Sequence, residues 1–275
     1  MKKADMAAVE SLLRANEDNY VSACAKFISR GVIKSPVWVL KRKDGNICAL
    51  VLNSRSTLMP VLCGADNIPM PDFLNSFLSF NKIHSVQGLT KEVSVLETAM
   101  EKKRMPVSDV YDYNLMSLKS GQLIVNNRLY AKNKDLVFKV PNLNDLDALA
   151  PLQAAYEKEE VLPKGSVFSY AASRMNTANI ITGKRILCAE LDGRLIGKIN
   201  INAVSYTRFQ VGGVYVHPDF RNMGIGQRMA AAFIESFINE CTGVTLFVKK
   251  SNIAACRLYA GLGFTVSGDY RITYY

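Results

Sequence analysis

The six residues Arg221 to Gly226 have the composition of an anion-binding turn. They read Arg-Asn-Met-Gly-Ile-Gly and follow an apolar, β-branched run, Val211–Val216, that Pro218 ends. The glycines lack a Cβ that would hold a ligand away, and they accept backbone angles closed to other residues. Apolar residues recur at helical spacing from Ile225 onward, so we expect a helix to begin there with its first amides unpaired at the positive end of its dipole. Such a turn binds phosphate or pyrophosphate.

The spacing of the glycines separates this turn from other phosphate-binding motifs. G-x-G-x-x-G and G-x-x-x-x-G-K-[ST] are both absent, whereas R-x-x-G-x-G follows a strand that ends in V-x-P. Farther along, the predicted strand Val244–Val248 precedes N-x(6)-Y-x-x-x-G-F, which runs from Asn252 to Phe264. Together the two segments resemble the acetyl-CoA signature of the GNAT (Gcn5-related N-acetyltransferase) acyltransferase superfamily over the last half of the chain. The alternative is an ordinary α/β turn.

The resemblance implies how the chain would hold its co-substrate, acetyl-CoA. The amides of Asn222–Gly226 would bind the pyrophosphate, while Arg221 would shape the turn or add charge. The central strand Phe209–Val216 and the strand Val244–Val248 would splay apart and pair with the pantetheine arm. The residues expected to contact the cofactor are Val214, Tyr215, Val216, Arg221, Asn222, Met223, Gly224, Ile225, Gly226, Gln227, Asn252 and Tyr259.

Two glycines inside the central strand fit this geometry. Gly212-Gly213 predicts a β-bulge or a close backbone approach, which splaying requires. The other interpretation is a gap in side-chain packing.

Tyr259 occupies the position of the general acid in the family that the chain resembles. A phenol with an ordinary pKa of about 10 can protonate a leaving thiolate at neutral pH. The alternative is a half-buried tyrosine that anchors its helix. Asn252 can bond the cofactor, cap the helix that follows it, or do both.

A general base has to come from outside the central strand. The central strand carries no carboxylate, and the nearest candidates are Glu157, Glu159 and Glu160, at the end of a predicted helix that would border the acceptor site. Tyr156 and Glu160 are four residues apart and share a helical face, with Glu157 beside it. We name Glu160 and Glu157 as candidates. The plain alternative is solvated charge at the end of a helix.

The composition excludes several other classes of function. The net charge of +10 is spread evenly, with 17 basic and 12 acidic residues in each of the segments 1–130 and 131–275, so we expect no nucleic-acid partner. No apolar run approaches the roughly 18 residues of a membrane span, and the start of the chain has no signal peptide. Six scattered cysteines and only two histidines favour a reduced, cytoplasmic protein with no metal site.

The elements that must position these residues divide the chain into two halves. We expect residues 131–275 to be a GNAT catalytic domain with a mixed α/β sheet, and residues 1–130 to repeat its order of elements. Two helices, a hairpin around Asp44-Gly45, a strand, a helix, a strand, a helix and a strand are predicted in the first half. Asp18 can cap its second helix, and Asn144 can cap the first helix of the second half.

The first half lacks the anion turn. Cys63-Gly-Ala-Asp follows its third strand, and Asp66 would repel a phosphate. Residues 1–130 are therefore either a degenerate GNAT-like domain, which gives a tandem fold, or an unrelated α+β domain.

The sequence predicts an enzyme that transfers an acetyl group from acetyl-CoA to a primary amine of a small molecule, amino acid or peptide, directly and in a ternary complex. The alternative is a non-catalytic acyl-CoA sensor or interaction protein. The acceptor is not readable from the sequence, and a monomer and a homodimer remain open.

Overall fold

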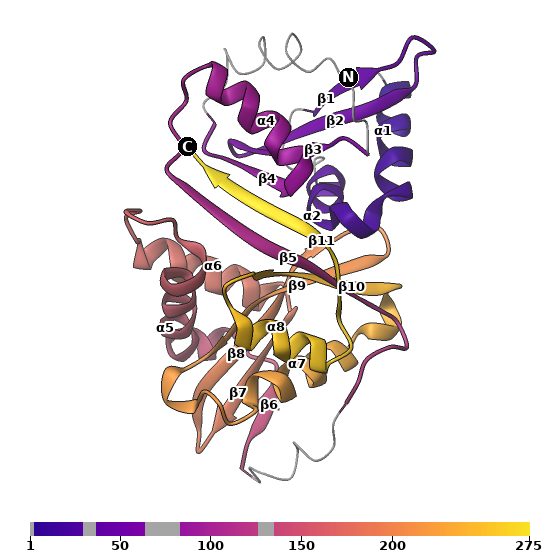
Figure 1. The fold of residues 1–275 in the computed structure, drawn as a ribbon. Helices are drawn as coiled ribbons and strands as arrows, with labels where there is room; N and C mark the ends of the chain where they lie inside the picture. The colour runs from indigo at the N-terminus through magenta and orange to yellow at the C-terminus, as the bar shows by residue number, and fades with distance from the viewer. Residues whose placement is uncertain (1–2, 30–36, 64–82, 126–134) are drawn as a thin grey trace.

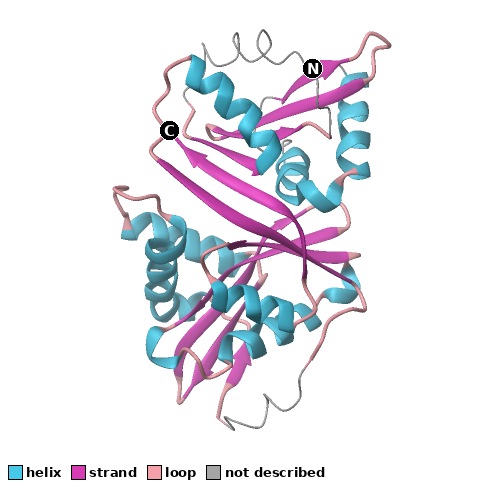
Figure 2. Cartoon of the chain, viewed as in Figure 1, coloured by secondary structure: helices cyan, strands magenta, loops and turns pink. Residues whose placement is uncertain are grey.

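The computed structural model describes residues 3–29, 37–63, 83–125 and 135–275. Helices pack on both halves of one long mixed sheet (Figures 1 and 2). The first half contains α1 (Lys3–Ala15), α2 (Glu17–Ile28), β1 (Val37–Lys41), β2 (Ile47–Ser54), β3 (Thr57–Val61), β4 (Ser85–Leu89), α4 (Thr90–Lys102) and β5 (Asp109–Lys119). The second contains β6 (Val137–Lys139), α5 (Leu146–Tyr156), α6 (Tyr170–Thr182), β7 (Ile186–Leu191), β8 (Arg194–Val204), β9 (Arg208–Val216), α7 (Ile225–Glu235), β10 (Gly243–Lys249), α8 (Ile253–Gly261) and β11 (Thr265–Tyr274).

The predicted order of elements is confirmed wherever the structure describes the chain. The helix expected after the third strand of the first half, and Asp66, lie outside the described residues. Two predicted helix caps are wrong. Asp18 lies inside α2, whose N-cap is Asn16. Asn142, not Asn144, makes the capping box of the short 3₁₀ turn before α5, because its Oδ1 accepts a hydrogen bond from Asn144 N at 2.8 Å.

The eleven strands follow the order β1-β2-β3-β4-β11-β5-β10-β9-β8-β7-β6. The two halves therefore interleave. β5 lies between β10 and β11, and β11 lies between β4 and β5. In Figure 1 these two long strands cross the middle of the molecule, and the C-terminal end of β11 lies beside the first half. The sequence predicted a sheet for each half, but not this exchange.

Each half contains one parallel strand pair that opens after a few residues. β9 pairs with β10 only from Arg208–Gly243 to Gln210–Thr245. β3 pairs with β4 only at Thr57–Ser85 and Leu58–Val86. The predicted splay of the central strand is thus present in the second half, and the first half has a similar one.

The core of the second half lies where α7 packs on the sheet. The apolar stripe of α7, which includes Ile225, Met229 and Phe233, is buried in the core cluster, where α7 packs on β7, β8 and β9. This burial fixes the start of α7 just after β9, as the helical period predicted.

A carboxylate at the start of α2 joins the halves. Glu17 accepts hydrogen bonds from the Ser205 and Thr207 hydroxyls and from the backbone N–H groups of Thr207 (2.7 Å) and Arg208 (3.0 Å). Burial raises the pKa of Glu17, but these hydrogen bonds outweigh that effect and lower it. The neighbouring Asp18 forms an ion pair with Arg208, so the first turn of α2 binds the loop between β8 and β9 through two carboxylates.

The exchange predicts that neither half folds alone. A chain of residues 131–275 lacks β5, which leaves β10 and β11 with open edges, and open edges promote aggregation. We expect the separate halves to be aggregated or poorly folded by circular dichroism and gel filtration, and the co-expressed halves to form a folded complex. A monomeric, cooperatively unfolding 131–275 fragment would contradict the importance of the exchange.

Candidate active site

The turn between β9 and α7 leaves a row of free amides. Asn222 and Gly224 have left-handed φ values of +63° and +75°, and Gly224, the N-cap of α7, has no side chain to bond the helix start. No residue in the described part of the chain accepts a hydrogen bond from the N–H groups of Asn222, Met223, Gly224, Ile225 or Gly226. This is the arrangement expected for an anion site at a helix N-terminus.

Arg221 closes the turn instead of lining it. Its Nε donates to the Val216 carbonyl at 3.0 Å, and its Nη2 bonds Glu159 Oε2 at 2.8 Å. Of the two roles left open by the sequence, the structure shows the shaping one. The Arg221 charge is paired with Glu159.

The second glycine of the motif serves helix packing. A Cβ on Gly226 would come within 3.2 Å of Leu258 Cδ1 on α8. A Cβ on Gly261 would come within 2.9 Å of Gln227 Nε2, so the Gln227 side chain lies over the end of α8. Small residues at both positions let α7 and α8 approach each other closely.

The predicted bulge in β9 is confirmed. The register slips between Lys198–Tyr215 and Asn200–Gly212, and Gly213 has φ +60°. Close approach also explains the glycines, because a Cβ on Gly212 would overlap the Asn202 amide and one on Gly213 would overlap Asn200 Oδ1.

A ladder of polar side chains from β8 holds the bulge. Lys198 Nζ donates to the Gly213 carbonyl at 2.7 Å and to Asn200 Oδ1 at 3.2 Å, and Asn200 Nδ2 donates to Asn202 Oδ1 at 2.8 Å. Lys198 is 0 % exposed, and its Nζ lies 4.6 Å from the ring centre of Tyr156. The sequence analysis missed this residue, although a lysine in the otherwise apolar Leu195–Ile199 run was a visible signal.

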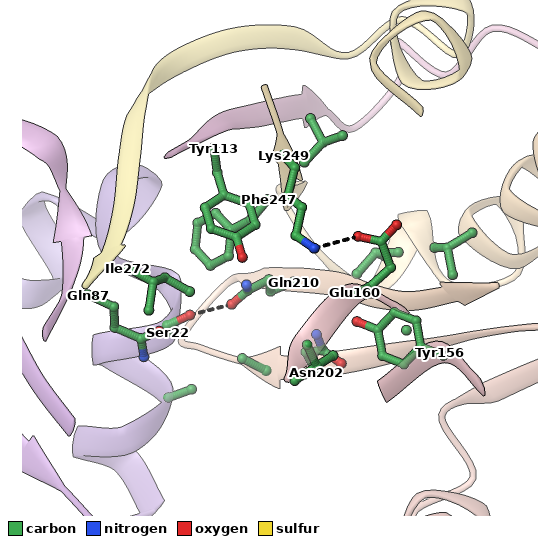
Figure 3. A pocket seen from close by; sticks show the side chains of 18 of the residues that line it. Ser22, Gln87, Tyr113, Tyr156, Glu160, Asn202, Gln210, Phe247, Lys249 and Ile272 are labelled. Atoms are coloured by element: carbon green, nitrogen blue, oxygen red, sulfur yellow. Dashed lines mark hydrogen bonds and ion pairs between the residues drawn. The ribbon is translucent and has the colours of Figure 1, made fainter. Parts of the chain in front are cut away.

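A cavity of about 550 Å³ opens where β9 and β10 diverge. Figure 3 shows its wall. Both halves contribute to it, since α2, β3, β4 and β5 meet α8, β8, β9, β10 and β11 there. Volumes of 300–1,000 Å³ are typical of small-molecule sites.

The three candidate carboxylates have different surroundings. Glu160 lines the cavity, where its Oε2 lies 3.1 Å from Lys249 Nζ and its Oε1 accepts from Asn252 Nδ2 at 3.4 Å. Glu157 does not line the cavity and accepts from Gln153 Nε2 at 2.7 Å and Asn176 Nδ2 at 3.0 Å. Glu159 holds Arg221. Glu160 is thus the carboxylate placed to meet a ligand.

Tyr259 also reaches the cavity wall, from α8. It is 6 % exposed and makes an edge contact with Phe264, with ring centres 5.7 Å apart. Burial raises the pKa of Tyr259, and Tyr156 and Glu160 raise it further, so the phenol keeps its proton. It can donate that proton, but its contact with Phe264 also fits the anchoring alternative.

The capping role predicted for Asn252 is confirmed, and its bond to the cofactor stays a prediction. It is the N-cap of α8, where its Oδ1 accepts from Ala255 N at 3.0 Å. It also lines the cavity, beside Val214 of β9. Tyr215 and Val216 lie in β9 on the way to the turn.

Two aromatic residues complete the group around Glu160. Tyr156 ends α5, and burial raises its pKa to about 12. Tyr113 comes from β5 of the first half and lies across the cavity from Tyr156 and Glu160 (Figure 3). Sequence reasoning missed Tyr113, because no local pattern places β5 between β10 and β11.

Among the described residues, no group of three or more His, Cys, Asp or Glu side chains is arranged to hold a metal ion. All six cysteines are free thiols. No helix in the described segments has the length and apolar character needed to cross a membrane.

The buried Lys198 predicts a pH-dependent stability. Burial lowers its pKa from 10.5 to about 7. At higher pH the unfolded chain still binds this proton and the folded chain does not, so the free energy of unfolding rises with pH, by at most about 1.4 kcal/mol per unit. In urea unfolding between about pH 7 and about pH 9, we expect Lys198→Met to remove this rise and the exposed Lys91→Met to keep it. If the free energy of unfolding had the same slope against pH in the wild type and in both variants, the shifted pKa of Lys198 would be contradicted.

Comparison with known proteins agrees with this geometry. Residues 152–264 match the model of the Acetyltransferase (GNAT) family, and a search of curated proteins finds no match. A Drosophila protein of known structure is 13 % identical with a TM-score of 0.70, and the match covers 100 % of this chain and 97 % of that one. A tandem GNAT protein from the clavulanic acid biosynthesis pathway is 13 % identical with a TM-score of 0.56, and the match covers 98 % of this chain and 95 % of that one. A GNAT acetyltransferase from Colwellia psychrerythraea is 12 % identical with a TM-score of 0.58, covering 96 % of each chain.

At these identities the structural matches establish the fold, which is the mixed α/β fold of the GNAT proteins, a tandem one among them. The family match covers the segment that contains the free amides, Glu160 and Tyr259. Residues 152–264, in the second half of the chain, therefore form a domain of the GNAT acetyltransferase family.

Proposed function

We propose that the protein transfers an acetyl group from acetyl-CoA to a primary amine of a small molecule, amino acid or peptide, directly and in a ternary complex. The observation that carries the proposal is the row of free amides from Asn222 to Gly226, which follows β9, a strand that lines a cavity with both a carboxylate and a phenol. Bare amides at a helix N-terminus suit a diphosphate, and acetyl-CoA supplies a diphosphate and a reactive thioester together.

The residues of the turn and of the splay fit coenzyme A. The amides of Asn222–Gly226 would hold the diphosphate. The open edge of β9 at Val214–Val216 would pair with the amides of the pantetheine arm, because β10 has left that edge by Gln210. Asn252 and Tyr259 lie on the α8 side of the same cavity.

We assign proton transfer to two side chains. Glu160 would take the proton that an acceptor ammonium must lose before its nitrogen can attack a carbonyl, either directly or through a water molecule. Tyr259 would hold a proton for the sulfur that leaves. Glu157, which bonds Gln153 and Asn176, would act on this site only through the helix end it shares with Glu160.

We also propose that residues 1–130 and 131–275 are two GNAT-like domains and that only the second binds the cofactor. In the first, the amides that follow β3 already have a partner. Leu62 N and Cys63 N donate to Glu92 Oε1 at 2.9 and 3.2 Å, and the Tyr20 hydroxyl donates to the same oxygen at 2.5 Å. These amides are therefore not available to a phosphate.

Binding of coenzyme A tests the turn. We expect saturating CoA or acetyl-CoA to raise the melting temperature, with a stabilisation of about 2.7 kcal/mol at a hundred times the dissociation constant. Gly224→Glu should abolish the shift, because it places a side chain and a negative charge among the amides. Gly45→Glu, in another left-handed turn, should keep it. An unchanged wild-type melting curve would refute the assignment.

Tyr259→Phe separates an enzyme from a non-catalytic acyl-CoA sensor. If Tyr259 protonates the leaving sulfur, the variant should lose roughly 10²-fold or more in kcat with its CoA affinity unchanged. Tyr270→Phe removes another buried phenol, one outside this cavity, and should leave kcat near the wild-type value. Thiol release with a broad panel of amines measures kcat, and titration calorimetry measures affinity. No thiol release with any amine, together with normal CoA binding, would favour the sensor.

A further inference from the structure

The end of the cavity that faces the first half has a different chemical character from the end near α8. Figure 3 shows Ser22 and Gln87 on one side, Glu160 and Tyr156 on the other, and Tyr113, Phe247 and Gln210 between them. Ser22 comes from α2, Gln87 from β4 and Gln210 from the start of the splay in β9. We call Ser22, Gln87 and Gln210 the amide end of the cavity.

Two amide NH₂ groups of the amide end, those of Gln87 and Gln210, have no partner among the described residues, and the Gln87 carbonyl oxygen has none either. Ser22 Oγ donates to Gln210 Oε1 at 2.5 Å, a bond that joins the two halves and leaves the Gln210 amide NH₂ for another partner. Gln87 makes no side-chain hydrogen bond to any residue that the structure describes. Asn202, next along the wall, uses its Oδ1 on Asn200 and keeps its NH₂. Such donors bind an oxygen acceptor.

The wall of the cavity also has apolar parts. Phe247 lies in the middle, and Ile272 and Met59 lie near Gln87 at the amide end (Figure 3). In the described wall of the cavity, Glu160 is the sole carboxylate, so an ammonium group would meet a negative charge only at the end opposite the amide end, where Lys249 Nζ lies 3.1 Å from Glu160 Oε2. A ligand that meets both ends carries an amine and, some distance away, an oxygen acceptor.

Coenzyme A, bound as proposed, would leave the amide end open. Its diphosphate would lie before α7, and α7 packs against α8, so its arm would enter the cavity at the Asn252 and Tyr259 side.

We propose that the amide end binds a carbonyl oxygen of the acceptor, so that the acceptor class is amines bearing an amide or carboxylate group, and that the first half of the chain determines this selectivity. The inference rests on the proposed acetyltransferase activity. Gln87 and Gln210 are its specificity-determining residues, and Ser22 positions Gln210.

Matched acceptors test the selectivity. Two sets of acceptors are used, each matched in size: glycinamide, glycine and butylamine, and β-alaninamide, β-alanine and pentylamine. Within each set the acceptors are compared by thiol release, and by titration calorimetry on the protein saturated with free CoA. We expect the amide or the carboxylate of each set to exceed the alkylamine about tenfold in kcat/KM and in affinity, since one net hydrogen bond contributes about 1.4 kcal/mol. Gln87→Leu and Gln210→Leu should bring the ratio near one, and the exposed Gln122→Leu should keep it.

A further variant identifies the source of the carbonyl. Lys26, an exposed cation on the rim one turn after Ser22, would favour a carboxylate. If Lys26→Ala lowers kcat/KM for the amino acids alone, the bound group is a carboxylate. If it changes kcat/KM for neither the amino acids nor the amino amides, the bound group is an amide.

Three results would overturn the inference. Alkylamines used as well as their carbonyl-bearing partners would refute it while leaving the acetyltransferase activity intact. A rate that rises with acyl-chain length from acetyl-CoA to longer acyl-CoAs would assign the amide end to the acyl group instead. Failure of every amine, despite CoA binding, would instead refute the proposed activity on which the inference rests.

Discussion

Strand β5 is hydrogen-bonded along both edges to strands of the second half, β10 and β11, and the candidate site depends on this pairing. β10 parts from β9 after Thr245 and leaves that edge unpaired by β9, while the opposite edge of β10 pairs with β5 from Gly243–Lys119 to Lys249–Tyr113. The splay can therefore stay open without a strand collapsing into it. The same strand brings Tyr113 to the cavity, so one pairing both supports the site and supplies part of its wall.

The two halves treat the end of their diverging strand in opposite ways. In the first, the carboxylate of Glu92 accepts from the amides after β3, and burial raises the pKa of that carboxylate. In the second, the turn after β9 keeps its amides bare, which is tolerable because the turn is exposed to water. The first half thus satisfies these amides with its own carboxylate and the second leaves them free, which fits the proposed diphosphate site.

Local features of the site were predictable from sequence, because their cause lies in a few adjacent residues. The turn at Arg221–Gly226, the start of α7 and the bulge at Gly212-Gly213 each follow from residue type and short-range period. Tyr113, Ser22 and Gln87 were not predictable as wall residues, because they reach the cavity through pairings between strands far apart in the chain. The sequence also could not predict which of the three glutamates lines the cavity, because Glu157–Val161 forms a π-helical turn that departs from the α-helical spacing.

The position of β11 has a consequence for how the protein is made. Thr265–Tyr274 pairs with Ser85–Leu89 and with Asp109–Lys119, strands that leave the ribosome well over a hundred residues earlier. During synthesis the first half can assemble its hairpin and helices, yet its sheet stays open until the last strand emerges. Closure of the sheet is thus a late, long-range step, slow by its contact order. A chaperone that shields β4 and β5 during translation would act on the interval in which this chain is most exposed to misassembly.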